Sequence, residues 1–373
     1  VLQALVDTSG TYTVPKMSIT DSPAAAYRTI MIDLARQPSG IGMVKEVVRL
    51  ARHYKLRYLQ LHLTDDQNVT FPFTPVTDNI TNNFTYSRAE LNDLVAYADA
   101  RGITIIPELD LPGHSTKLKQ SGYIDPSASD WDVADPVNYA KIQAIIDDML
   151  SVFVNTPYFH IGGDESGAGS RLVPFLEAMN KHLRGTPTGG KRRMLVWEGF
   201  HGSPTAELPA TGDDRIIVLS WESSYNAPWD LLNAGYEIVN ASWKPLYVVG
   251  SGATNRYIHV SQRKWSPEIL HSWDKDTFMH WEPGRAVFED AGPNDPDTND
   301  GVWDAHWISR ENQVIGGQML SWEQNEKTIV RDLLPRLPVM ADRLWNPLGG
   351  VDFATFEARL DAVREMAMAI VHP

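Results

Sequence analysis

Two neighbouring acids follow a glycine pair in the middle of the chain, where residues 160–165 read HIGGDE. Close carboxyl groups in a partly buried place repel each other and lose water, which raises the pKa of one and leaves the other ionised. Asp164 and Glu165 can therefore supply one proton donor and one anion. Adjacent side chains of a regular strand point to opposite faces, so both acids can serve one site only if the chain bends. The glycine pair before them permits that bend.

An aspartate and a histidine elsewhere in the chain could tune this pair. Asp65 lies in the string LTDDQ, and His114 ends the string PELDLPGH. An aspartate that fixes the tautomer of a histidine, whose other nitrogen meets a glutamic acid, tunes that acid towards neutral pH. We expect these two residues to lie beside Glu165.

Eight short β-branched or apolar runs, most of them separated by amphipathic helical stretches, would position these residues. We predict strands at 28–35, 58–65, 104–111, 158–165, 193–200, 216–222, 236–243 and 315–322. Helical spacing and capping residues predict helices that contain Val44–Ala51, Leu91–Ala98 and Ile142–Met149. Eight alternating units favour a (β/α)8 TIM barrel of the α/β class, since no glycine-rich phosphate loop follows the first strand.

The carboxyl ends of the predicted strands carry acids and tryptophans, and active sites of such barrels lie at those ends. We expect one catalytic domain over residues 25–373 after an N-terminal extension at 1–24. The segment at about 244–314, between strands seven and eight, is too long for a simple connection. We interpret it as an insertion on the substrate side.

The composition excludes several classes of protein. With 33 Lys+Arg against 47 Asp+Glu and a net charge of −14, the chain shows no basic surface for nucleic acid. No apolar run is long enough to span a membrane. The chain has no cysteine, which excludes thiolate chemistry, and we expect no cofactor and no metal. The chain starts with Val1, and we favour a secreted or periplasmic protein whose signal has been removed over a cytoplasmic one.

Taken together, the strings resemble glycoside hydrolase family 20, the β-N-acetylhexosaminidases. The resemblance runs from about residue 23 to residue 346. It is carried by Arg28, Met31-Ile32-Asp33, Ala35-Arg36, LHLTDDQ at 61–67, PELDLPGH at 107–114, HIGGDE, the tryptophans at strand ends, Gly316-Gly317 and ADRLW at 341–345.

The resemblance implies a retaining hydrolysis of terminal β-linked GlcNAc or GalNAc, in which the 2-acetamido carbonyl of the substrate is the nucleophile. Glu165 would be the general acid and later the base. Asp164 would orient the acetamido N–H and stabilise the oxazolinium intermediate. Tyr247 would assist the acetamido oxygen.

The same resemblance implies a set of substrate-binding residues. Three tryptophans would wall the pocket, and an arginine and an acid or amide would bind the ring hydroxyls. The candidates are Trp197, Trp221, Trp322, Arg28, and either Glu323 or Gln324, because the expected Trp-x-Glu reads Trp-Glu-Gln here.

Other activities stay open from the sequence. A two-carboxylate retaining glycosidase would use Glu198 or Glu222 as nucleophile. A metal-dependent hydrolase could use the rim histidines and aspartates, although none of the eight strands carries a His-x-His pair. A non-catalytic sugar-binding barrel would not need the acids, and a family member could release a disaccharide unit. The expected partner is a glycan or amino-sugar substrate, and the sequence does not indicate an oligomeric state.

Overall fold

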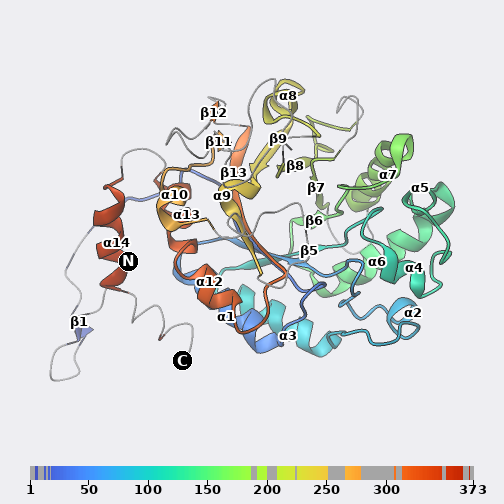
Figure 1. The fold of residues 1–373 in the computed structure, drawn as a ribbon, viewed down its shortest axis with the longest axis horizontal. Helices are drawn as coiled ribbons and strands as arrows, with labels where there is room; N and C mark the ends of the chain where they lie inside the picture. Colours follow the sequence, from blue (N-terminus) through green and yellow to red (C-terminus); the bar gives the residue numbers. More distant parts are fainter. Residues whose placement is uncertain are drawn as a thin grey trace, which may run out of the picture.

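The computed structural model describes residues 18–185, 191–199, 208–222, 225–250, 265–278, 313–346 and 350–363, together with residues 5–6, 12–13, 16, 306–307 and 369. Its centre is a closed parallel barrel with helices on the outside (Figure 1). The barrel strands are β3 (Tyr27–Asp33), β4 (Tyr58–His62), β5 (Thr104–Glu108), β6 (Tyr158–His160), β7 (Arg193–Trp197), β8 (Ile217–Ser220), β9 (Glu237–Asn240) and β13 (Val314–Trp322).

The barrel is closed by its eighth strand, β13, which pairs in parallel with β3 on one edge and with β9 on the other. Gly317 is in register with Arg28 of β3, and Gly316 is in register with Val239 of β9. All eight predicted strands are present in the predicted order, so the TIM barrel is confirmed. The strands read as apolar runs because helices cover their outer face and packed side chains fill their inner face.

The described helices follow the predicted capping signals. Ser87 forms a capping box with Glu90 at the start of its helix, and Asp135 caps a 3-10 turn. The helices are α1 (Ile41–His53), α2 (Thr74–Thr77), α3 (Arg88–Asp99), α4 (Thr116–Gln120), α5 (Asp130–Val133), α6 (Tyr139–Val152), α7 (Leu172–Gly185), α8 (Pro228–Asn233), α9 (Trp243–Leu246), α10 (Pro267–His271), α12 (Ile329–Leu333), α13 (Leu337–Trp345) and α14 (Phe353–Asp361), with 3-10 turns η1 (Pro136–Asn138) and η2 (Gly169–Arg171).

The amino end of the barrel is filled by three tyrosines. The rings of Tyr27, Tyr58 and Tyr158 lie with their centroids 5.3 to 5.8 Å apart. These rings close that end with apolar surface. Chemistry is thereby confined to the opposite end, where the strands finish.

Every barrel strand except β13 ends earlier than its apolar run predicts, and for three of them the early end places acids on loops. β4, β5 and β6 finish at His62, Glu108 and His160, so the acids that follow lie on loops at the carboxyl rim. After β4 the chain turns back on itself, since Thr70 N–H donates to Leu63 O. Loops can aim side chains that a regular strand would point alternately inwards and outwards.

The predicted insertion at 244–314 is described in part. Its strand β10 (Tyr247–Val249) pairs in parallel with β13, and β11 (Thr277–Phe278) pairs with β12 (His306–Trp307). Residues 251–264 and 279–305 lie outside the described residues. Near the N-terminus, β1 (Leu5–Val6) pairs with β2 (Tyr12–Thr13). None of the helices described here combines the length and the apolar character that a membrane span requires.

Candidate active site

The loop after β6 brings the two acids to one place, as the glycine pair predicts. Gly162 and Gly163 have φ angles of 79° and 101°, and Glu165 follows at 46°. A Cβ on Gly162 would lie 1.8 Å from Oδ1 of Asp110, which leaves no room for any other residue. The bend therefore depends on glycine both for its backbone conformation and for the close approach of a neighbouring carboxyl group.

Asp65, His114 and Glu165 form a chain of contacts at the rim. His114 Nδ1 lies 3.4 Å from Asp65 Oδ1, and its Nε2 lies 3.4 Å from Glu165 Oε2. Burial alone would lower the pKa of His114, but the carboxylates of Asp110, Asp65 and Glu165 outweigh it and raise that pKa well above the usual value. The predicted relay of aspartate, histidine and glutamate is thus present, with the histidine charged.

Asp164 and Glu165 have opposite pKa shifts in the unliganded site. Burial, with a contribution from the charge of Glu165, raises the pKa of Asp164 to about 7. The side chain of Glu165 is 49% exposed, and its hydrogen bond with His114 lowers its pKa. The unliganded pair therefore holds its proton on Asp164.

One oxygen of Asp164 is directly relevant to ligand binding. Its Oδ1 is buried and has no hydrogen-bond partner among the residues that the structure describes. A buried acceptor without a donor is costly, and in a native protein it calls for an explanation. A ligand that donates an N–H to this oxygen would remove the cost.

Aromatic rings stand around the acids. Trp221 and Tyr247 are stacked, with centroids 6.5 Å apart and planes 9° apart, and Tyr247 lies 6.1 Å from Trp322. The charges of Asp164 and Glu165 both act on Tyr247, whose pKa is raised well above its usual value, mainly by burial. The structure thus brings together three of the predicted residues. Trp197 is buried behind them, 6.1 Å from Trp322.

The predicted contact between Arg28 and the sugar is wrong. Arg28 lies near the amino end of β3, at the other end of the barrel, because the residue at the start of a strand cannot reach the rim where that strand finishes. Its guanidinium donates to Lys55 O at 3.0 Å and Ala25 O at 2.6 Å, and it lies over Trp345. These partners show that Arg28 fixes the base of the barrel.

Arg36 is the arginine at the carboxyl rim, and the sequence reading missed it. It lies 2.7 Å from Asp65 Oδ2 and 3.4 Å from Asp33 Oδ2, and its guanidinium lies 5.0 Å from the ring centre of Trp322. Its side chain is 20% exposed. The available signal was its place just after the end of the first strand, where catalytic barrels present side chains.

Glu323 is better placed than Gln324 to meet a ligand. The amide of Gln324 is buried and already engaged, donating to Val248 O and accepting from Thr328 Oγ1. The backbone N–H of Glu323 donates to Asp33 Oδ2, and the Glu323 charge acts on Arg36. The geometry therefore favours Glu323 for the ring hydroxyls.

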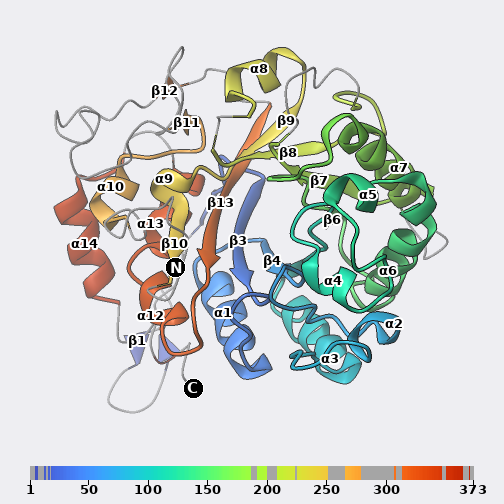
Figure 2. The same cartoon turned by 45° about the vertical axis from the view of Figure 1, so that its right-hand side comes forward.

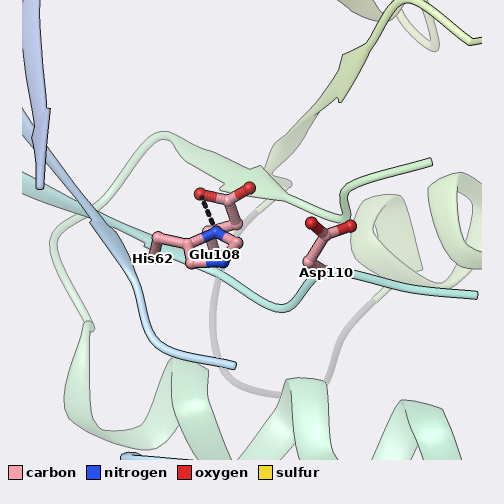
Figure 3. A group of neighbouring side chains, drawn as sticks. All are labelled: His62, Glu108 and Asp110. Atoms are coloured by element: carbon pink, nitrogen blue, oxygen red, sulfur yellow. Dashed lines mark ion pairs between the residues drawn. The ribbon is translucent and has the colours of Figure 1, made fainter. Parts of the chain in front are cut away.

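A buried carboxylate beneath the rim holds several of these residues in place. Glu108 has no exposed surface, accepts hydrogen bonds from Gln60 Nε2 at 2.9 Å and Trp197 Nε1 at 2.8 Å, and lies 3.1 Å from His62 Nδ1. Figure 3 shows the contact with His62. His62 Nε2 in turn lies 2.9 Å from Asp65 Oδ2.

Charge complementarity explains how this group can be buried. Burial by itself would lower the pKa of His62, yet the carboxylates of Glu108 and Asp65 raise it well above its usual value. His62 is therefore an imidazolium between two carboxylates. His160 differs, since its Nδ1 accepts from Gly162 N–H and burial lowers its pKa to about 4.

Three groups of histidine and carboxylate side chains in the described part of the chain have ligand atoms within 4.8 Å of one another. All three overlap the site above. They are His62, Glu108 and Asp110 (Figure 3); Asp65, Asp66 and His114; and Asp110, His114 and Asp164. In the first, His62 Nδ1 lies 3.1 Å from Glu108 Oε2, while its Nε2 is already engaged with Asp65 Oδ2 at 2.9 Å.

Comparisons with known proteins place this geometry in a family. The sequence profile of "Glycosyl hydrolase family 20, catalytic domain" matches residues 26–172 and 168–348. A "Beta-N-acetylhexosaminidase" of Cellulomonas fimi is 33% identical over 391 residues, which cover 94% of this chain and 69% of the relative. The chain belongs to glycosyl hydrolase family 20. It is thus a glycoside hydrolase.

Other relatives and solved structures resemble the chain at lower sequence identity. "Beta-hexosaminidase A" of Caenorhabditis elegans is 30% identical, over 90% of this chain and 63% of the relative. The chain thus spans about two thirds of the length of these two relatives. A β-N-acetylhexosaminidase structure from Bacteroides fragilis has a TM-score of 0.72 at 16% identity, covering 93% of this chain and 71% of the other. The structure of Dispersin B has a TM-score of 0.65 at 16% sequence identity, and the match covers 85% of this chain and 98% of Dispersin B. Both show the same fold.

The first prediction concerns the pH dependence of the acid pair. Between the pKa of Glu165, which is below its ordinary 4.5, and that of Asp164 at about 7, the pair holds one proton. We expect kcat/KM for an aryl β-N-acetylglucosaminide to fall above about pH 7, as that proton is lost, and to fall again on the acid side, at the lowered pKa of Glu165, as both carboxyls become protonated. Initial rates across pH measure both limbs.

A variant assigns the alkaline limb. In Asp164→Asn the pair has lost the group that titrates near 7, so the residual activity should decline with the lower pKa of Glu165. An alkaline limb that stays near 7 in this variant would assign the titration to another group.

The second prediction concerns the buried carboxylate. Glu108→Gln replaces one acceptor oxygen by a donor that faces either the indole N–H of Trp197 or the imidazolium of His62. Breaking a buried charged pair on one side costs about 3–5 kcal/mol, so urea denaturation should show a loss of that size. The exposed Glu357→Gln is the matched control and should change stability by less than about 0.5 kcal/mol. A loss below about 1 kcal/mol in Glu108→Gln would show that the charge of Glu108 is not needed.

Proposed function

We propose that this chain is an exo-acting β-N-acetylhexosaminidase that removes terminal, non-reducing GlcNAc or GalNAc with retention of configuration. The nucleophile is the 2-acetamido carbonyl oxygen of the substrate. Glu165 is the acid and base, and Asp164 is the anion that holds the acetamido group. The names of the relatives from Cellulomonas fimi and Caenorhabditis elegans support this choice of substrate.

The observation that carries the proposal is the buried Oδ1 of Asp164, which lies next to Glu165 and has no hydrogen-bond partner within the described ranges. A neutral sugar hydroxyl could donate to it, but an acetamido N–H also presents its carbonyl oxygen to the anomeric carbon. Hydrogen bonding to the charged form lowers the pKa of a carboxyl group. Binding would thereby turn Asp164 into the anion that the reaction requires.

The reaction balances with the residues in place. The carbonyl oxygen forms a bond to C1 while the bond from C1 to the leaving oxygen breaks, and the proton of Glu165 moves to that oxygen. Water then attacks C1 and gives a proton back to Glu165, while the bond from C1 to the acetamido oxygen breaks and the oxazolinium ring opens. The positive charge of the intermediate is met by Asp164, and holding the nucleophile near C1 replaces a bimolecular step by an intramolecular one.

The surroundings suit an amino sugar. The stacked Trp221 and Tyr247, with Trp322 beside them, offer apolar surface for the acetamide methyl and the sugar face. Arg36 and Glu323, which both bind Asp33, supply a donor and an acceptor for ring hydroxyls. The hydroxyl that differs between GlcNAc and GalNAc would be read there.

The two-carboxylate glycosidase is less well supported by the geometry. Glu198 has no exposed surface, and its Oε2 accepts from Ser220 Oγ at 2.7 Å. Glu222 is also buried, although its charge acts on Tyr247. A nucleophile must contact the anomeric carbon, and neither carboxylate is as accessible as Glu165.

The third prediction separates the two mechanisms by substrate. The chain should hydrolyse aryl β-N-acetylglucosaminide or β-N-acetylgalactosaminide but not aryl β-glucoside, and N-acetylglucosamine-thiazoline should inhibit it, because only the acetamido sugars carry the nucleophile. Initial rates on the three glycosides test this. Turnover of the glucoside, or indifference to the thiazoline, would point to Glu198 or Glu222 instead.

The fourth prediction tests the two acids. Asp164→Asn should lower kcat about 10²–10³-fold, since the intermediate loses its anion. Glu165→Gln should lower kcat by about 10²–10⁴-fold on chito-oligosaccharides and less on nitrophenyl glycosides, whose leaving oxygen needs little protonation. Exposed Asp78→Asn and Glu357→Gln are the matched controls and should keep wild-type rates. Wild-type rates in Asp164→Asn would contradict substrate assistance.

Two further readouts of the same assay bear on the remaining alternatives. Chitotriose should yield GlcNAc as the first product, whereas initial release of chitobiose would indicate a disaccharide-releasing enzyme. Activity should survive dialysis against EDTA, and loss that zinc restores would support the metal-dependent mechanism.

A further inference from the structure

Trp131 is an exposed aromatic side chain on the same rim as the acids. Its side chain is 38% exposed, and it lies on α5, in the segment that leaves the carboxyl end of β5 and also carries His114. Most indoles in proteins are largely covered. Trp229, 43% exposed on α8, is the other strongly exposed tryptophan in the described part of the chain.

Several contacts tie α5 to the loop that carries Glu165. Asp130 Oδ2 accepts from the backbone N–H of Gly167, two residues after Glu165, at 3.0 Å. Gly169 approaches the indole so closely that a Cβ there would lie 3.4 Å from Cζ3. Figure 2 shows α5 beside the start of α7, which follows this loop. These contacts join α5 to the residues that directly follow Glu165.

Charged groups surround the indole and fix its position. Arg171 Nη1 donates to Trp131 O at 3.0 Å, its guanidinium lies 4.5 Å from the ring centre, and it pairs with Asp135 at 2.8 Å. Lys119 lies 3.7 Å from Asp130. All four charged side chains keep some exposed surface. An apolar ring within a polar rim, held rigid before binding, suits a pyranose, which has an apolar C–H face and hydroxyls at its edge.

The chemistry of Glu165 indicates which sugar would lie here. An acid that protonates the leaving oxygen lies on the leaving-group side of the scissile bond. Residues next to the loop that carries this acid, such as those of α5, can therefore contact the leaving group. We propose that Trp131 and its rim of Lys119, Asp130, Asp135 and Arg171 form a subsite for the leaving-group sugar of an oligosaccharide. This inference rests on the proposed function, because it takes Glu165 as the acid.

The test compares substrates with and without a second sugar. Tri-N-acetylchitotriose offers a leaving sugar, whereas methyl β-N-acetylglucosaminide has the same kind of poor leaving group without one. Trp131→Ala should raise KM for chitotriose about tenfold, the loss expected for one aromatic contact, and should leave kcat/KM for the methyl glycoside within about twofold of wild type. Trp131→Phe should restore most of the chitotriose KM.

Control variants and outcomes separate the alternatives. Trp229→Ala removes a similarly exposed indole from α8 and should change neither the KM for chitotriose nor kcat/KM for the methyl glycoside. An equal loss on both substrates in Trp131→Ala would show that the indole only supports the catalytic loop, and no loss on either would show that no sugar binds there. Each result would overturn the subsite while leaving the wild-type activity intact. A wild-type chain that hydrolyses neither glycoside would instead overturn the proposed function.

Discussion

The buried carboxylate of Glu108 is the group on which the arrangement of the site depends. It lies inside the barrel, where an unpaired charge would be prohibitive, and its neighbours supply the missing donors and a positive charge. Through His62 it fixes Asp65, and its hydrogen bond with Trp197 holds the indole that lies behind Trp322. The relay and the aromatic wall therefore share one support. A site held by such a network is already arranged before substrate binds, so little binding energy is lost in ordering it.

Backbone geometry contributes the second constraint. The acids lie together because β6 stops at His160 and the chain turns through two glycines with positive φ. Gly162 also approaches Asp110 closely. Burial and the charge of Asp164 raise the pKa of Asp110 well above its usual value. The bend thus places three carboxyl groups together, and burial raises the pKa of two of them, Asp110 and Asp164.

The sequence was sufficient to predict the barrel and the contacts among Asp65, His114 and Glu165, and insufficient for the arginine and the strand ends. Strand order, the helix periodicity from Val44 to Ala51 and the capping box at Ser87 depend on local patterns, and the structure has them. The predicted role of Arg28 was wrong because the sequence of a strand does not show which of its residues lies at the carboxyl rim. Choosing Glu323 over Gln324 likewise required knowing that Val248 and Thr328 already bind the amide. Glu108 could not be recognised either, since its partners Gln60, His62 and Trp197 come from two other strands.

The proton distribution of the unliganded acid pair is the reverse of what the proposed reaction needs, and this has a physical explanation. Burial and the charge of Glu165 raise the pKa of Asp164 to about 7, whereas the hydrogen bond with His114 lowers the pKa of Glu165, whose side chain is half exposed. In the proposed reaction, a substrate would change both pKa values at once. Its acetamido N–H would stabilise the anion of Asp164, and its rings would exclude water from Glu165, which would raise the pKa of that carboxyl group. On this proposal, binding of an acetamido sugar moves one proton from Asp164 to Glu165 without a change in net charge. A sugar that lacks the acetamido group would leave the proton on Asp164.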